Sequence, residues 1–409
     1  MATMYPFALL WNRFCMTITM IMPRKICIMT NNRADFSRLR TVIAALQKRD
    51  EVTVQLFVTG THLLDDYGSS IREIQEENFP IAYTMHTEVS GRVPVTMAKS
   101  AGNAITELAG VFSNFKPDIV VVHGDRYEAL AATIAASFLN IFVAHIQGGE
   151  VSGTIDEHIR HAITKLSHAH FPSNEDALER IVRLGERPDM VFNVGCPASD
   201  ILLHSPTCSF TQLREELMQL AKKASWKDQF NEDFALVVFH PVTTEFGSAK
   251  KAASALIDAL SSKKIKNPFL ILWPNIDAGA QEIVDSLKKF ERDMNGRVGI
   301  FKHFPLPLYV NILRHAKVMI GNSSSGIREA CYFGTPVVDV GTRQEKRACT
   351  KNVLHVGYDS NAIEDAILKQ LQHGRYEPEY PFGAGDAGEK IAGILATIDT
   401  TNVQKHITY

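Results

Sequence analysis

The sequence has almost no excess of either charge, since 43 lysines and arginines face 45 aspartates and glutamates for a formal charge of −2. This balance gives no reason to expect nucleic acid or an anionic membrane as the main partner, so any phosphate would have to be bound by locally placed cations. The six cysteines form no CxxC pair and most lie in apolar runs, which favours buried reduced thiols over disulfides or zinc. Low-complexity tracts and short-period repeats are also missing.

Long hydrophobic runs are missing as well. The first 23 residues are apolar and rich in methionine, but Arg13 interrupts them and no small-residue cleavage site follows. The run is too short and broken to span a bilayer. We interpret residues 1–23 as an extension ahead of the fold, with Met16, Met20 and Met22 as alternative starts. A membrane-surface anchor is the alternative, and we expect a cytoplasmic protein.

The rest of the chain alternates short β-rich runs with segments of helical period, which is typical of βαβ units and parallel sheets. A length of 409 residues exceeds what one core usually serves, so we expect two doubly wound α/β domains that face each other across a cleft. Their limits are placed at 24–204 and 205–380, with 381–409 as a loop and helix that return to the first domain. The predicted strands are 25–31, 52–59, 118–123, 141–146, 190–194, 234–239, 269–273, 298–301, 317–320, 336–340 and 353–356.

Polar clusters directly follow several of these strands. In open α/β sheets, ligands bind at the carboxyl ends of the strands, so these clusters are expected to line one cleft from both domains. They begin at Thr30, His123, Gln147, His240, Pro274 and Gly321.

A GxGxxG pattern at 383–388 resembles a dinucleotide fingerprint. It follows a proline-containing stretch and lies near the C-terminus, whereas the fingerprint joins a strand to a helix in a βαβ unit. We interpret it as a flexible loop before the last helix, and no nicotinamide site is expected.

The segment 321–326, Gly-Asn-Ser-Ser-Ser-Gly, is the strongest phosphate candidate, because N–H groups at a helix start bind anions. Plain helix capping by serine is the alternative. Glu329, one turn further on, could bind a ribose, and Arg343 could add a cation. Arg33 and Ser37 could meet a phosphate at the start of the first helix or belong to a solvated turn.

His240 precedes a proline at a strand end and can point into the cleft, although a lone histidine is more often structural. Asn275 follows a tryptophan that could contact a base or ribose or belong to the core.

Carboxylates cluster between Asp125 and Glu157. Asp156 and Glu157 open a helix, where acidic side chains ordinarily complement the dipole, and Arg160 and His161 follow one turn later. Pairing with a helix dipole explains Asp125 and Glu150 less well. Several carboxylates beside an arginine suit general acid–base catalysis if burial separates their pKa values.

Together these residues resemble the UDP-N-acetylglucosamine 2-epimerase family, and most of all its hydrolysing branch, which makes N-acetylmannosamine for sialic acid synthesis. The resemblance extends from Lys25 to Ile398. The segments that carry it are 32–37 (NRADFS), 123–126 (HGDR), 148–156 (GGEVSGTID), 158–165, 240–244 (HPVTT), 274–277 (PNID), 321–329 and 341–344 (GTRQ).

The resemblance implies the glycosyltransferase-B type of fold, two Rossmann-like domains with the active site between them, and neither nicotinamide nor an essential metal. It also implies binding of a UDP-N-acetylhexosamine, release of UDP, and a homodimer or homotetramer. Asp125, Glu150, Asp156 and Arg160 would surround the sugar. UDP would be held by Arg33, Ser37, Arg126, His240, Asn275, His303, Ser323, Ser324, Glu329 and Arg343, with His240 also a candidate for catalysis.

Gln147 departs from the family pattern, because many members carry a glutamate there that is a candidate catalytic acid or base. Glutamine exchanges no proton near neutral pH, so that role must pass to Asp125, Glu150 or Asp156, or be dispensable. The expected mechanism is elimination of UDP to a 2-acetamidoglucal, then addition of water with a proton returned to the opposite face of C2. Four alternatives stay open: the same reaction on a 6-deoxy di-N-acetyl sugar nucleotide, a non-hydrolysing epimerase, a glycosyltransferase, or a non-catalytic sensor.

Overall fold

The computed structural model describes residues 22–65, 70–91, 93–152, 155–221, 224–275 and 277–408. Residues 1–21 of the predicted extension lie outside the described part. Within that part, none of the helices combines the length and the apolar character needed to cross a membrane.

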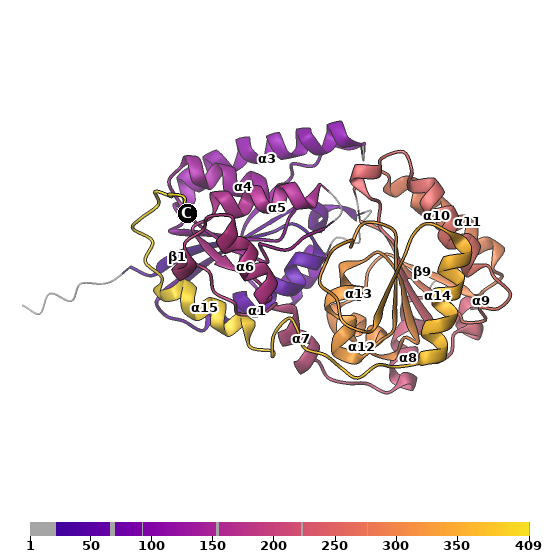
Figure 1. Ribbon diagram of the computed structural model, residues 1–409. Helices are drawn as coiled ribbons and strands as arrows, with labels where there is room; N and C mark the ends of the chain where they lie inside the picture. The colour runs from indigo at the N-terminus through magenta and orange to yellow at the C-terminus, as the bar shows by residue number, and fades with distance from the viewer. Residues whose placement is uncertain are drawn as a thin grey trace, which may run out of the picture.

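The N-terminal half forms a six-stranded parallel sheet with the order β3-β2-β1-β4-β5-β6. Helices cover both of its faces (Figure 1). The strands are β1 (Arg24–Thr30), β2 (Val52–Thr59), β3 (Ile81–Met85), β4 (Ile119–His123), β5 (Phe142–Ile146) and β6 (Ala169–Phe171). The main helices are α1 (Arg33–Gln47), α3 (Pro94–Phe115), α4 (Tyr127–Phe138), α5 (Asp156–Leu166) and α6 (Glu175–Arg183).

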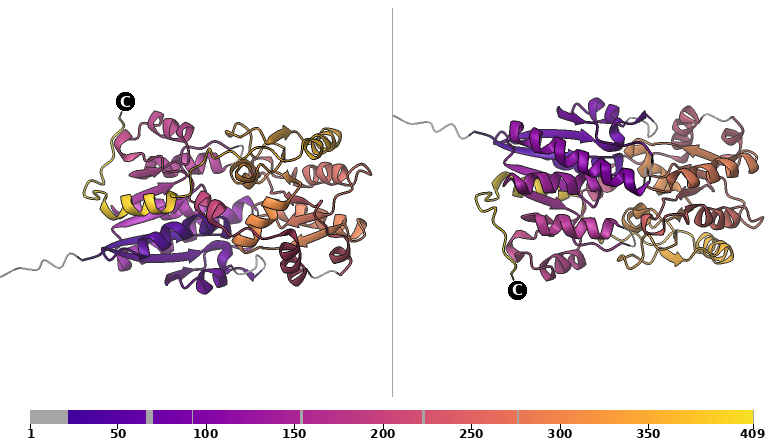
Figure 2. Two further views of the ribbon diagram at one scale, coloured as in Figure 1. Left: turned by 90° about the horizontal axis from the view of Figure 1, so that it is seen from below. Right: turned by 90° about the horizontal axis from the view of Figure 1, so that it is seen from above.

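The C-terminal half forms a second parallel sheet with the order β12-β11-β10-β7-β8-β9. Its strands are β7 (Ala235–Val238), β8 (Phe269–Leu272), β9 (Val298–Phe301), β10 (Val318–Gly321), β11 (Val337–Val340) and β12 (Val353–Val356). The helices around it are α8 (Phe210–Leu220), α10 (Ala249–Leu260), α11 (Ala280–Asp293), α12 (Leu306–His315), α13 (Ser324–Arg328) and α14 (Ser360–His373). The views in Figure 2 show the two sheets with their helices as separate layered units side by side.

Both sheets have the same topology, because in each the first strand lies between the second and the fourth. Strand order reverses there, which leaves a crevice beyond the carboxyl ends of β1 and β4 in one sheet and of β7 and β10 in the other. The predicted fold class is therefore confirmed: two Rossmann-like α/β units of the kind that binds nucleotides.

Two separate clusters of buried apolar side chains pack on the faces of each sheet. The central strands are buried on both faces, which explains why they appear in the sequence as continuous Val- and Ile-rich runs.

The prediction of a strand at 190–194 is wrong. A 3-10 helix spans Pro188–Met190, and only an isolated bridge joins Val191 to His170. The sixth strand is β6, which has three residues and is too short to show a period, and the edge strand β3 was not predicted.

The GxGxxG segment leads into α15 (Ala387–Thr397), which packs against α1 in the N-terminal half. The N–H groups of Ala387 and Gly388 both donate to the carboxylate of Asp200, at 2.9 and 2.7 Å. A side chain of the protein thus occupies the anion position at this helix start. The glycine at 388 also allows close packing, because a Cβ there would lie 2.6 Å from Thr41 Oγ1.

Gly321 at the end of β10 is expected to tolerate no side chain. Its φ is +133°, and a Cβ would lie 2.1 Å from the carbonyl oxygen of Val238 in β7. We expect Gly321→Ala to destabilise the C-terminal unit by about 1–3 kcal/mol or more, measured as a lower Tm. Gly357→Ala is the control, because nothing lies within 4 Å of its added Cβ and its φ needs no glycine. Equal Tm values for the two variants would contradict the assignment.

Candidate active site

Two adjoining cavities lie where the carboxyl ends of both sheets meet. One has a volume of about 740 Å³ and the other about 700 Å³, and Ala34, Arg38, Asn275 and Ser324 line both. Their walls come from the N-terminal unit (α1 and the loop after β4) and from the C-terminal unit (the loops after β8 and β10). We call the first the carboxylate cavity and the second the serine cavity.

The structure brings most of the predicted site residues together in these two cavities. Asp125, Arg126, Asp156 and Arg343 line the carboxylate cavity. Arg33, Ser37, His240, His303, Ser323 and Glu329 line the serine cavity, and Asn275 and Ser324 are shared. Glu150 and Arg160 line neither of them. These two lie behind the wall of the carboxylate cavity.

A paired amide fixes His240 at the switch point of the second sheet. The buried Asn322 side chain accepts from the His240 N–H at 2.7 Å and donates to the His240 carbonyl at 2.9 Å. The His240 ring is fixed too, because its Nδ1 accepts from the Asn275 N–H at 3.1 Å, so the ring proton is on Nε2. Burial, aided by the charges of Arg343 and Arg33, lowers the pKa of His240 well below its ordinary value. His240 is therefore a neutral donor, suited to bind a ligand oxygen.

The two units are joined across the serine cavity by Arg38 of α1. Its guanidinium binds Glu329 at 2.8 Å, and both side chains are nearly inaccessible. Glu329 also accepts from Ser325 Oγ at 2.6 Å, so each of its oxygens already has a protein donor. Ser323 caps α13, its hydroxyl accepting from the Ser325 N–H. The serine segment thus caps a helix, as one interpretation had it, and it also faces a cavity. Phosphate binding there stays a prediction.

Arg33 and Ser37 start α1 on the other wall of the serine cavity. Arg33 Nη1 donates to the Lys302 carbonyl and lies 3.5 Å from His303 Nδ1, so it crosses between the units. Burial lowers the pKa of Arg33 to about 10, which still leaves it charged at neutral pH. Ser37 donates to the Ala34 carbonyl within its own helix.

Two further arginines cross the carboxylate cavity. Arg126 pairs with Asp277 of the opposite unit, and Arg343 lies 3.9 Å from Asp156. Together with the Arg38–Glu329 pair, these ion pairs hold the walls contributed by the two units in position against each other.

Asp125 and Asp156 face the carboxylate cavity in different electrostatic states. Burial opposes the ionisation of Asp125, but Arg160, which binds it directly, and Arg347 outweigh burial and hold its pKa well below the ordinary value. For Asp156, burial and the neighbouring charge of Asp125 raise the pKa to about 6, although Arg343 opposes them. One carboxylate is thus ionised and the other is poised for protonation, a separation that suits an acid–base pair.

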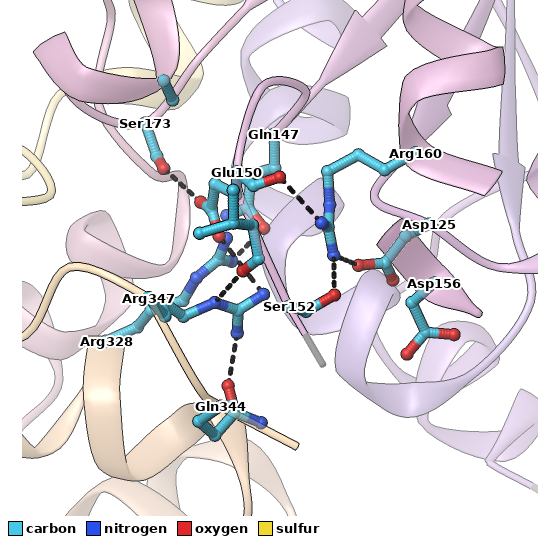
Figure 3. Close-up of polar contacts among 12 residues, drawn as sticks. Asp125, Gln147, Glu150, Ser152, Asp156, Arg160, Ser173, Arg328, Gln344 and Arg347 are labelled. Carbon is cyan, nitrogen blue, oxygen red and sulfur yellow. Dashed lines mark hydrogen bonds and ion pairs between the residues drawn. The ribbon is translucent and has the colours of Figure 1, made fainter. Parts of the chain in front are cut away.

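Glu150 forms a buried ion-pair cluster between the two units (Figure 3). Arg328 and Arg347 of the C-terminal unit approach its carboxylate, Arg328 in direct contact and Arg347 at 3.5 Å, while Ser173 donates to it at 2.6 Å. Burial opposes its ionisation, yet the two arginines lower its pKa to about 2. The direct contacts go to Oε1, while Oε2 has the ion pair with Arg347 and no hydrogen bond among the described residues. With its pKa lowered in this way, Glu150 is an interdomain ion-pair partner and a poor proton donor.

Gln147 lies beside this cluster, between Glu150 and the carboxylate cavity. Its backbone has φ of +64°, its amide oxygen accepts from Arg328, and its amide nitrogen donates to Cys196. The side chain is thus held in place by Arg328, which also binds Glu150. The neutral amide leaves Arg328 with one carboxylate partner.

Arg38, Asp277, Arg328 and Arg347 were not among the predicted site residues, and His123 was expected to line the cleft only as the start of a polar cluster. Arg328 follows the serine segment by two residues, and Arg347 follows Arg343 by four, so their positions were a weak signal. His123 is 7% exposed, lines the carboxylate cavity, and its Nε2 has no hydrogen-bond partner in the described structure. Burial and the charge of Arg38 lower its pKa to about 4, so its ring is neutral.

Across residues 22–408, leaving out the short undescribed gaps, no three histidines, cysteines or acids are placed to hold a metal ion.

A family model described as UDP-N-acetylglucosamine 2-epimerase matches residues 44–396, most of the chain. The chain belongs to this epimerase family. It is 34% identical to the UDP-N-acetylglucosamine 2-epimerase of Neisseria meningitidis serogroup B, over 93% of this chain and 97% of that protein. It is 35% identical to the UDP-N,N'-diacetylbacillosamine 2-epimerase (hydrolyzing) of Legionella pneumophila, over 92% and 97%.

Solved epimerase structures share the fold. The structure of UDP-GlcNAc 2-epimerase from Methanocaldococcus jannaschii with UDP-GlcNAc and UDP has a TM-score of 0.73 at 21% identity, covering 91% of this chain and 99% of that one. The structure from Neisseria meningitidis bound to UDP-GlcNAc has a TM-score of 0.72 at 20% identity, with the same coverage. These matches agree with a fold of two Rossmann-like units.

Proposed function

We propose that the protein is a hydrolysing UDP-N-acetylglucosamine 2-epimerase. It converts UDP-N-acetylglucosamine and water to N-acetylmannosamine and UDP, the first step of sialic acid biosynthesis. The observation that carries the proposal is the pair Asp125 and Asp156, which face one cavity in different protonation states beside a second cavity lined by cations and hydroxyls. Relatives named as hydrolyzing 2-epimerases and a relative named as a polysialic acid biosynthesis protein support it.

The serine cavity suits the uridine diphosphate. Arg33, the Nε2–H of neutral His240 and the hydroxyls of Ser323 and Ser324 would hold the phosphates there. Arg343, which lines the adjoining carboxylate cavity, would add a cation. Negative charge on the diphosphate grows as the C1–O bond breaks, so these donors would stabilise the transition state more than the bound substrate.

The carboxylate cavity suits the sugar. As the C1–O bond stretches, positive charge at C1 acidifies the hydrogen on C2. Asp125, ionised at rest, would take that proton and leave the 2-acetamidoglucal. Asp156, protonated below about pH 6, would return a proton to the opposite face of C2. The proton that water loses on adding to C1 would pass to the Asp156 carboxylate. Gln147 and Glu150 would position Arg328 and take no part in proton transfer, so the reaction would not need a glutamate at position 147.

The second candidate is the same reaction on UDP-2,4-diacetamido-2,4,6-trideoxyglucose, which leads to legionaminic acid. The 35% identity to the Legionella pneumophila enzyme favours it. Supplying each nucleotide and measuring the free sugar separates the two substrates.

Solvent deuterium tests the reaction itself. In D₂O we expect UDP release without any sugar acceptor, and a free N-acetylmannosamine-type product that carries one deuterium at C2, read by mass spectrometry and proton NMR. A product without deuterium would rule out the glycal route. A 2-epimer that keeps UDP would indicate a non-hydrolysing epimerase, release that needs an acceptor would indicate a glycosyltransferase, and binding without turnover would indicate a sensor.

A further inference from the structure

A thiol, an imidazole and a carboxylate are aligned at the edge of the second sheet, outside both cavities. Asp339 of β11 and His355 of β12 are register partners. His355 Nδ1 lies 2.8 Å from Asp339 Oδ2, and His355 Nε2 lies 3.4 Å from Cys349 Sγ. Cys349 and His355 are exposed, whereas the Asp339 carboxylate is buried.

This order of groups suits activation of the thiol by a general base. Asp339 holds the ring proton on Nδ1, so the lone pair of Nε2 faces the sulfur. The hydrogen bond from His355 to Asp339 raises the pKa of the imidazole and makes it a better base. Partial burial and the charge of Asp339 raise the pKa of Cys349, so the sulfur rests as a thiol and gives its proton to His355 only as it attacks.

The other described cysteines have no such arrangement. Cys27, Cys196 and Cys331 are buried, and Cys208 is half-buried. A histidine also lies near Cys208, but His315 contacts its backbone carbonyl at 2.9 Å and not its sulfur. Cys208 is therefore a matched control within the same chain.

Cys349 is also connected to the cleft, because it follows Arg347 by two residues. Arg347 donates to the Val151 carbonyl at 3.2 Å and to Gln344 at 2.7 Å, and lies 3.5 Å from Glu150. A group attached to Cys349 Sγ would have to open the 3.4 Å contact with His355, which would move the segment that carries Arg347.

We propose that Cys349 is a redox-modification site, which His355 and Asp339 activate toward low-molecular-weight disulfides and whose mixed disulfide slows the reaction by loosening Arg347 from Glu150. The Cys349 sulfur attacks one sulfur of the disulfide RSSR, whose S–S bond breaks as a new one forms. The thiol proton passes to His355 Nε2 and then to the departing thiolate, which leaves as RSH. Excess free thiol reverses the exchange. The effect on the cleft rests on the proposed function, whereas the reactivity of Cys349 does not.

The reactivity is tested with oxidised glutathione on the full chain carrying Cys15→Ser, since Cys15 lies outside the described residues. Intact-mass and peptide mass spectrometry give the rate and the position of the adduct. We expect the adduct at Cys349, at least about tenfold faster than at Cys208, and a drop of at least about tenfold in H355Q, with a smaller drop in D339N. His355 is exposed and glutamine keeps a donor that can reach Asp339, so H355Q is expected to fold, which its Tm checks. An equal rate in H355Q, or equal reaction at Cys208, would overturn the proposal.

The proposed effect of the Cys349 adduct on the cleft is tested by measuring the rate of UDP release. We expect the glutathione adduct at Cys349 to slow UDP release several-fold and dithiothreitol to restore the original rate. C349S should release UDP at the normal rate, with or without oxidised glutathione. Full activity of protein completely modified at Cys349 would refute the effect on the cleft. The adduct rates would still test the reactivity of the thiol. A protein that releases no UDP from either nucleotide would refute the proposed function and leave the reactivity test intact.

Discussion

Asp156→Asn is expected to lower the rate of UDP-sugar hydrolysis by about 10²–10⁴-fold, because the amide keeps the shape of the carboxyl group and cannot donate its proton to C2. Binding of UDP, measured by calorimetry, should change little, since the diphosphate would bind at the serine cavity. Asp258→Asn is the matched control, because Asp258 is exposed on α10, and its activity should be normal. A hydrolysis rate of Asp156→Asn within tenfold of that of the parent protein would refute the assignment of Asp156 as the acid.

The same assignment predicts the pH dependence. Asp156 acts as an acid only while protonated, and its pKa is raised from the ordinary 3.8 to about 6. The rate should therefore fall about tenfold per pH unit above about pH 6. Asp125 stays ionised throughout this range, because Arg160 and Arg347 outweigh burial and keep its pKa low. A rate that rises with pH from 6 to 8 would refute the role of Asp156 as the acid.

Glu150→Gln is expected to destabilise the protein by about 3–5 kcal/mol, because it leaves Arg328 and Arg347 buried without their carboxylate. The measurement is Tm, and each kcal/mol corresponds to about 2–4 °C in units of this size. The double variant Glu150→Gln/Arg328→Met also removes one of the two unpaired arginine charges, so it should recover part of the lost stability. The folded pKa of about 2 lies below the ordinary 4.5, so the contribution of Glu150 is complete above about pH 4.5 and is lost as the pH falls toward 2.

The control for this cluster is Glu179→Gln. Glu179 also pairs with an arginine, Arg183, but both side chains are more than half exposed. Such pairs contribute about 0–1 kcal/mol, so Tm should hardly change. A stable Glu150→Gln protein that has lost only its activity would show that Glu150 acts in catalysis and not as an interdomain ion-pair partner.

The sequence by itself determined the architecture and the location of the site. Buried strands of a parallel sheet are continuous apolar runs, and the polar residues that follow them gather at one edge, so a local pattern was enough to place Asp125, His240 and the serine segment at a cleft. Strand β6 was missed because its three residues are too few to show a period. Strand β3 was missed because, as a half-buried edge strand, it lacks the continuous apolar run of the central strands.

Only the tertiary structure decided which charged residue does what. Arg328 contacts Gln147 across 181 positions of sequence, and such pairings have no local signature. Glu150, Asp125 and Asp156 look alike in the sequence. Two neighbouring arginines lower the pKa of Glu150, direct binding by Arg160 lowers that of Asp125, and burial with a nearby carboxylate raises that of Asp156. The reason is physical: a pKa depends on the charges and solvent that surround a group in space, and these are set only when the two units face each other.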